Sequence, residues 1–169
     1  MFASGPDWTR ELKKAEHMLD EWRESVRSQT RRLMKAIVDI LCDPQIPVFV
    51  SFGRHCANDF LHLLGIYLGT PAYFICDSDE LYNHFMQEIP KYMGIWCSPT
   101  FLKRTAGICN TNNPFSFNYT SCHNYFAMYL KVFRRRIVKI PRELYNKMVR
   151  LGLLDPNHII GECLDNIPE

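Results

Sequence analysis

The chain has 169 residues, 47% hydrophobic and 22% charged, which is long enough and apolar enough for a folded domain with its own core. This composition excludes an intrinsically disordered chain, and no apolar run approaches the roughly 18 residues of a membrane-spanning helix. The first residues mix acids and bases where a signal peptide needs an apolar core, so we expect an intracellular protein.

The first predicted element is a long helix over residues 7–42. Apolar residues follow one another at intervals of four and three from Trp8 to Ile40, the pattern of a heptad seam. Asp7 can cap its start and Asp43-Pro44 can stop it. The seam packs either within the domain or against a second copy, and packing within the domain is the commoner arrangement.

Residues 46–97 predict an alternation of strands and helices. The short β-branched and aromatic runs 46–52, 71–77 and 91–96 are typical of buried strands. Helices are expected over 55–69, ended by Gly69, and over 77–88, where Asp77 and Glu80 have capping-box spacing. This order indicates a single α/β domain over 1–169, or alternatively an α+β domain, with the long helix packed on a small sheet.

Residues 98–169 are harder to interpret. A loop rich in Asn, Gly and Pro is followed by residues 121–136, which fit either a strand or a helix. Pro141 predicts a helix through Arg150, and residues 155–167 predict a short last one.

The net charge of +2 conceals a strongly basic segment, residues 131–150, called the basic block below. It holds eight bases and one acid, whereas residues 1–42 hold eight bases and seven acids. It is either a solvated face or a docking surface for an acidic protein or nucleic acid. The bases predicted to contact a partner are Arg134, Arg135, Arg136, Lys139, Arg142, Lys147 and Arg150.

The seven cysteines are widely spaced and contain no Cys-x-x-Cys pair. In an intracellular chain this pattern indicates buried free thiols. Cys97, Cys109, Cys122 and His123 could together bind zinc, but a structural zinc site usually has at least one tight ligand pair, so no cofactor is predicted.

A cysteine-dependent hydrolase is the third functional hypothesis, with Cys56 or Cys122 as the nucleophile. Both have a histidine neighbour, His55 and His123. Adjacent side chains diverge on a helix and point apart on a strand, so this adjacency gives little support to catalysis.

The stretch NPFSFNYTSCHNYF, residues 113–126, interleaves aromatic and polar side chains. Such interleaving occurs in proteins that stack nucleic-acid bases, and it also occurs in a half-buried strand. We favour core packing for these aromatics. Nucleic-acid binding through the basic block is therefore the second functional hypothesis, after protein binding.

Several motifs resemble the adenoviral early-region-four thirty-four-K family, the viral adaptor of a host ubiquitin ligase. Ser116, Phe117, Tyr119 and His123 match its Ser-Phe-x-Tyr step with a histidine four residues later. RRLMKAIVDILC, HCANDFLHLLG, IPKYMGIWCSPTFLKR and the basic block also resemble family segments in the same order. The family is longer and richer in cysteine, which puts a shared zinc site in doubt.

This resemblance implies a non-enzymatic adaptor in the host nucleus or cytoplasm. Its partners would be host elongin and cullin components, together with a viral protein or a host target protein. The family binds elongin through a short helix with an apolar residue, a cysteine four later, and another apolar residue. Two windows fit this outline: Val38, Cys42 and Ile46, which Pro44 interrupts, and Ile159, Cys163 and Ile167, which fits better.

Overall fold

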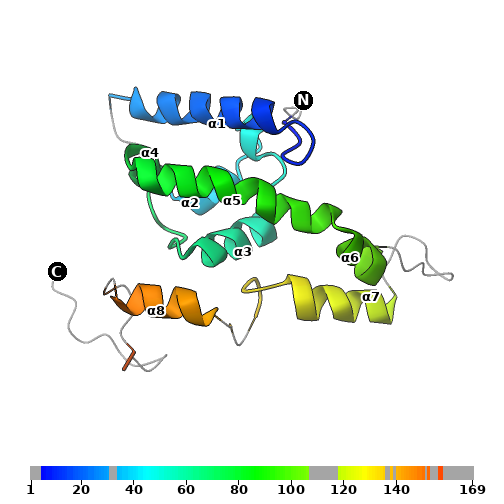
Figure 1. Cartoon of the computed structure of the whole chain (residues 1–169). Helices are drawn as coiled ribbons and strands as arrows, with labels where there is room; N and C mark the ends of the chain where they lie inside the picture. Colours follow the sequence, from blue (N-terminus) through cyan, green and yellow to red (C-terminus); the bar gives the residue numbers. More distant parts are fainter. Residues whose placement is uncertain are drawn as a thin grey trace. The chain divides into compact units, whose positions relative to one another are not determined.

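The computed structural model describes residues 5–30, 34–106, 118–135, 138, 140–150, 152, 156 and 157, and in these the chain is helical (Figure 1). The chain divides into two compact units, Met1–Ile137 and Val138–Glu169, which are described separately. None of the helices in the described ranges is long and apolar enough to cross a membrane. The elements of the first unit are α1 (Leu12–Arg27), α2 (Ile37–Leu41), η1 (Pro47–Phe49), α3 (Arg54–Leu64), α4 (Ala72–Asp77), α5 (Asp79–Cys97), α6 (Pro99–Phe101), η2 (Leu102–Ala106), α7 (Tyr119–Asn124) and η3 (Tyr125–Tyr129), and the second unit contains α8 (Arg142–Arg150).

The prediction of a sheet is wrong. The expected strand 46–52 forms the 3₁₀ turn η1, the expected strand 71–77 forms α4, and 91–96 lies inside α5. Among the described residues only one isolated β-bridge occurs, between Ala36 and Pro71. Short apolar runs fit a buried helix turn as well as a strand, and periodicity alone cannot separate the two.

The long N-terminal helix is shorter than predicted. The helix α1 ends at Arg27, and the chain resumes as the short helix α2. Before α2 the backbone is extended at Ala36, and the Ile37 N–H donates to the carbonyl of Thr70 at 2.8 Å. The helix cannot continue through this position because the chain pairs with residues 70–72 there.

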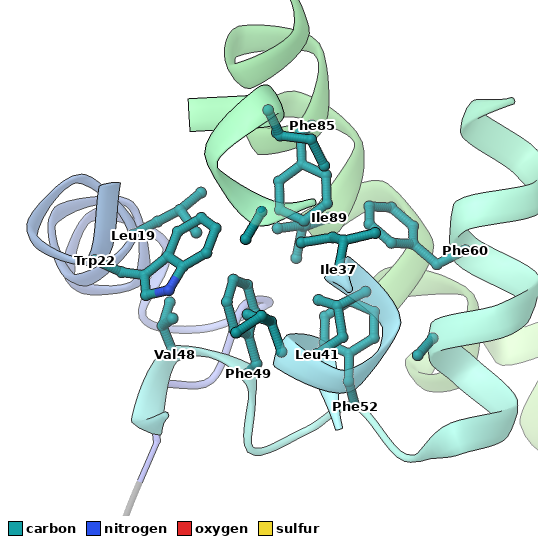
Figure 2. Close-up of a cluster of buried hydrophobic side chains, with 14 of the residues drawn as sticks. Leu19, Trp22, Ile37, Leu41, Val48, Phe49, Phe52, Phe60, Phe85 and Ile89 are labelled. Atoms are coloured by element: carbon teal, nitrogen blue, oxygen red, sulfur yellow. The ribbon is translucent and has the colours of Figure 1, made fainter. Parts of the chain in front are cut away.

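The seam of α1 nevertheless packs into the core of its own unit. Ala15, Leu19, Trp22 and Val26 are buried, whereas Leu12 is 40% exposed. Figure 2 shows Leu19 and Trp22 facing side chains from η1 and α5. Packing within the domain, the commoner of the two predicted arrangements, is what the structure shows.

Aromatic rings form much of this core (Figure 2). Phe49 lies 5.0 Å from the Trp22 ring in an edge-on contact, and Phe60 lies 5.4 Å from Phe85. Aromatic pairs prefer such edge-on arrangements, which add to the stabilisation from buried area. The rings join α1, η1, α3 and α5 into one unit.

Helix α5 is tied to α1 by polar contacts as well. The Asp79 carboxylate pairs with Arg23, and also with Arg27 at 3.3 Å. The Tyr82 hydroxyl donates to Asp20 at 2.7 Å. The N-cap of α5 lies one residue later than predicted, at Ser78 in place of Asp77, and the Ser78 hydroxyl accepts a hydrogen bond from the Leu81 N–H.

The helix α3 ends earlier than predicted. Gly65, with φ of 69°, forms its left-handed C-cap, in place of Gly69. In the segment 121–136, which fits either a strand or a helix by sequence, the residues up to Tyr129 are helical and residues 130–135 form neither a strand nor a helix. In the second unit, α8 confirms the helix predicted to follow Pro141. The predicted last helix lies outside the described residues, apart from a turn at 156–157.

Candidate functional site

Asp59, in the middle of α3, is a carboxylate with no solvent exposure. Its oxygens accept hydrogen bonds from three successive backbone N–H groups, those of Lys131, Val132 and Phe133, at 2.7, 2.8 and 3.1 Å. A buried carboxylate needs such donors, and bonds to an ionised acceptor are stronger than neutral ones. Asp59 therefore fixes the position at which the basic block begins.

Asp59 is not among the site residues predicted from the sequence. One sequence feature could have identified it. Asp59 is spaced by three and four residues from Cys56 and Leu63, so on a helix this acid lies on the same side as apolar residues that pack against the core. Its donors lie more than 70 residues away, so no local pattern could identify them.

His55 lies beside this carboxylate. Its Nε2 is 3.3 Å from the Asp59 Oδ2, and its Nδ1 is 3.1 Å from the Tyr125 hydroxyl oxygen. The rings of Trp96, Tyr125 and Phe133 surround the imidazole at centroid distances of 5.6 to 5.9 Å. His55 thus joins α3 to α5, η3 and the segment that Asp59 holds.

The aromatic stretch contributes to this cluster only in part. Tyr125 packs against His55, whereas Tyr119 and Phe126 are 85% and 47% exposed. Phe115 and Phe117 lie outside the described residues. The interpretation of these aromatics as core thus holds for Tyr125 and fails for Tyr119 and Phe126, because a helix places them on different sides.

Arg135, predicted to contact a partner, is engaged within its own unit. Its guanidinium donates to the carbonyls of Phe126 and Leu130 and lies 4.3 Å from the centre of the Phe126 ring. The last carbonyls of a helix lack intrahelical partners, and a nearby cation satisfies them. Arg135 therefore caps the end of η3.

Arg134 differs from its neighbour. It is exposed, has a left-handed φ of 57°, and lies 5.3 Å from the Phe133 ring. A side chain in this backbone region is uncommon, and here the conformation follows directly after the residues held by Asp59. The structure describes two of the three consecutive arginines, Arg134 and Arg135. Of these two, Arg134 is the one whose guanidinium can contact a partner.

The other predicted partner residues fall into two groups. Arg142, Lys147 and Arg150 lie on α8 and are exposed. Arg136, Lys139, Ile159, Cys163 and Ile167 lie outside the described residues.

The first elongin-type window is partly buried in the core. Val38, Cys42 and Ile46 all pack against it, and α2 ends before Cys42. Burial raises the pKa of the Cys42 thiol. These three residues do not form one helix, so the window lacks the geometry that the resemblance implies.

Cys56 is poorly suited to be a nucleophile. Burial raises the pKa of its thiol, whereas nucleophilic cysteines have a depressed pKa and an electropositive setting. The neighbouring His55 is turned towards Asp59 and Tyr125. Cys122 is exposed on α7, and the ring of His123 stacks on Tyr119. Neither cysteine has the arrangement of a catalytic pair.

The candidate zinc ligands do not come together in the described residues. Cys97 at the end of α5 and Cys122 on α7 are both exposed, and Cys109 is outside the described ranges. No group of three metal-binding side chains occurs among the described residues.

We predict less than one equivalent of zinc in the purified protein, because no tight ligand pair is present in the sequence. Elemental analysis of the purified chain would measure this. Stoichiometric zinc that is lost on Cys97→Ser or Cys122→Ser would contradict the prediction and indicate a site completed by Cys109.

Comparison with protein-family models, with curated proteins and with solved structures finds no match for this chain.

Proposed function

We propose that this chain is a non-enzymatic protein-interaction adaptor and that α8 is one of its binding elements. The observation that carries the proposal is the division of α8 into two faces. At about 100° per residue, Leu144, Tyr145, Met148 and Val149 occupy one arc, while Arg142, Asn146, Lys147 and Arg150 occupy the opposite one with Glu143. None of the α8 residues is buried.

An amphipathic helix of this kind suits an apolar groove on another protein. In that mode of recognition, apolar anchors spaced by three and four enter the groove and the polar side remains at its rim. Three bases against one acid on α8 favour a groove with an acidic rim, because complementary charge speeds association and excludes wrong partners.

The resemblance to the adenoviral adaptor family suggests which partners to test. In this proposal the chain links a viral partner or a host target protein to host elongin and cullin, inside the nucleus or cytoplasm. The raised pKa of the half-buried Cys56 thiol and the internal contacts of His55 are consistent with a non-enzymatic role.

Affinity purification of the full chain from human cells would test the adaptor. We expect elongin and cullin to co-purify with the parent, and Leu144→Glu with Met148→Glu to remove at least one protein partner. Both substitutions place charge in the apolar face of α8, where it would have to be buried in the complex.

The matched control is Asn146→Glu with Lys147→Glu on the polar face of the same helix. Because these positions are exposed at the rim, the changes should leave the partner bound, slow its association and reduce the weakening of that association by salt. If both double variants lose the same protein partner to the same extent, or if both retain every partner, α8 is not the binding helix. Absence of elongin and cullin from the parent would contradict the ligase connection.

A further inference from the structure

A cavity of about 510 Å³ lies where four segments of the first unit meet. Its walls come from the turn that precedes α1, the end of η1, the first turn of α3 and the last turns of α5. Small-molecule sites in proteins typically have volumes of about 300 to 1,000 Å³. The cavity is therefore large enough to enclose a small organic ligand.

The N-terminal wall of this cavity is fixed by close packing against η1. The buried Trp8 donates its indole N–H to the Val48 carbonyl at 3.0 Å. Gly5 lies so close to η1 that a Cβ atom there would be 2.2 Å from the Pro47 carbonyl oxygen. Only a residue without a side chain allows this approach. The protein itself thus holds residues 5–8 in place, and the wall is pre-formed.

The ionised side chains that line the cavity are the carboxylates of Asp7 and Glu11. The Asp7 N–H donates to Glu11 Oε2 at 3.0 Å, which places the two residues at the same end of the cavity. Hydrogen bonds from the Thr9 hydroxyl and N–H hold the pKa of the Asp7 carboxyl below its ordinary value, and the bond from the Asp7 N–H lowers the pKa of Glu11. None of the described residues that line the cavity is a lysine, an arginine or a histidine.

Two bases outside the cavity compete only weakly for these carboxylates. The Arg10 Nε is 3.9 Å from Asp7 Oδ2, and the Lys14 Nζ is 3.1 Å from Glu11 Oε1. Their side chains are 87% and 58% exposed, and ion pairs at such exposure are weak because water competes for both charges. Neither base lines the cavity, so this end of it is electronegative.

The opposite walls are mainly apolar. Val50, Met93 and Trp96 contribute to them, together with the thiols of Cys56 and Cys97. Apolar walls with a few polar groups at one end suit a ligand that has an apolar body and one polar group. The charge at the polar end decides the sign of that group.

We propose that this cavity binds a small organic cation, a primary amine carried on an apolar or aromatic body. The ammonium group would donate to Asp7 and Glu11, and the body would cover Val50, Met93 and Trp96. An anion would be repelled by the same carboxylates. The inference goes beyond the adaptor function and does not depend on it, because the cavity lies in the first unit and α8 in the second.

Fluorescence titration of the full chain with dansyl-cadaverine, a naphthalene sulfonamide with a primary amine, would test the proposal. Two analogues of the same shape show the effect of charge: neutral N-pentyl dansylamide and anionic dansyl-6-aminohexanoate. We expect dansyl-cadaverine to bind with a Kd of about 10–100 μM. It should bind at least about tenfold more tightly than the neutral analogue, and the anionic analogue should bind most weakly.

Asp7→Asn with Glu11→Gln should lower the affinity for dansyl-cadaverine to that for the neutral analogue. Both substitutions keep an oxygen acceptor for the local N–H donors, so binding of the neutral analogue should stay within about twofold of the parent. The matched control is Glu21→Gln with Glu24→Gln, which removes two exposed carboxylates of α1 outside the cavity. This variant should bind all three compounds within about twofold of the parent.

The place of binding can be measured on the parent protein by cysteine alkylation. Cys97 lines the cavity and is exposed, whereas Cys122 is exposed on α7 and does not line it. With dansyl-cadaverine at about ten times its Kd, alkylation of Cys97 by iodoacetamide should slow about fivefold or more. Alkylation of Cys122 should not change, and mass spectrometry of the digested protein reads both sites.

Four results would overturn the inference. They are no binding of dansyl-cadaverine at about 1 mM, equal binding of the neutral or anionic analogue, equal weakening by the control variant, and no selective protection of Cys97. If the Asp7 and Glu11 variant loses the neutral analogue as well, the wall of the cavity has been disturbed. The protection of Cys97 in the parent then decides.

Discussion

Leu19→Asp is expected to lower the free energy of unfolding by more than about 4 kcal/mol. Leu19 is fully buried on α1 and faces the aromatic core (Figure 2). The substitution removes a packed apolar side chain and places a carboxylate inside the hydrophobic cluster. A domain of this size is stable by only about 5–15 kcal/mol, so a large fraction of the variant would be unfolded. Denaturant titration followed by circular dichroism and tryptophan fluorescence measures the change.

Leu12→Asp is the matched control for this variant. Leu12 occupies the same heptad position one repeat earlier on α1, but it is 40% exposed. The same chemical change there should cost no more than about 1 kcal/mol. An equal loss of unfolding free energy in Leu12→Asp and Leu19→Asp, together with a change in oligomeric state, would contradict this expectation. It would show that a second copy of the chain covers the apolar seam of α1.

The two helices that the sequence predicted best are the amphipathic ones. In α1 and α8, apolar residues recur at helical spacing over several turns, and no other regular structure has that period. Pro141 also marked the start of α8. For α8 the pattern identified the helix and its start, whereas for α1 it identified the helix and its buried face but not its end at Arg27.

The predicted strands failed because they are short. Residues 46–52, 71–77 and 91–96 are apolar runs whose burial is the same in a helix turn as in a strand. Two of them include a proline, at Pro47 and Pro71, that directly precedes or opens a helical turn. Whether these segments form strands or helical turns depends on tertiary packing, which the local sequence does not show.

The basic block shows how much of the candidate site could be predicted from the sequence. Its charge was visible in the sequence, but the different roles of Arg134 and Arg135 were not. Arg135 is engaged because the free carbonyls of η3 lie within its reach, and Arg134 is exposed because Asp59 holds the residues before it. The second condition depends on hydrogen bonds between Asp59 of α3 and residues 131–133, which lie more than 70 positions apart in the sequence.

Asp59→Ala is expected to lower the free energy of unfolding by about 2–4 kcal/mol and to release residues 131–135 from α3. The change removes the acceptor of three backbone N–H groups and leaves His55 without its carboxylate neighbour. Hydrogen exchange should show the amides of Lys131, Val132 and Phe133 exchanging at least about tenfold faster. Denaturant titration gives the global change.

The comparison with Asp39→Ala separates this contact from a general effect of charge. Asp39 is an exposed carboxylate of α2, and its removal changes the net charge equally at a cost of about 0.5 kcal/mol or less. The loss of unfolding free energy in Asp59→Asn should lie between those of Asp59→Ala and Asp39→Ala. The asparagine amide keeps one oxygen acceptor, but it places an NH₂ group against the remaining N–H donors. If Asp59→Ala behaves like Asp39→Ala in both measurements, the hydrogen bonds to residues 131–133 do not hold the basic block. If the exchange of α1 amides rises as much as that of residues 131–133, Asp59 stabilises the whole unit and has no local role in presenting Arg134.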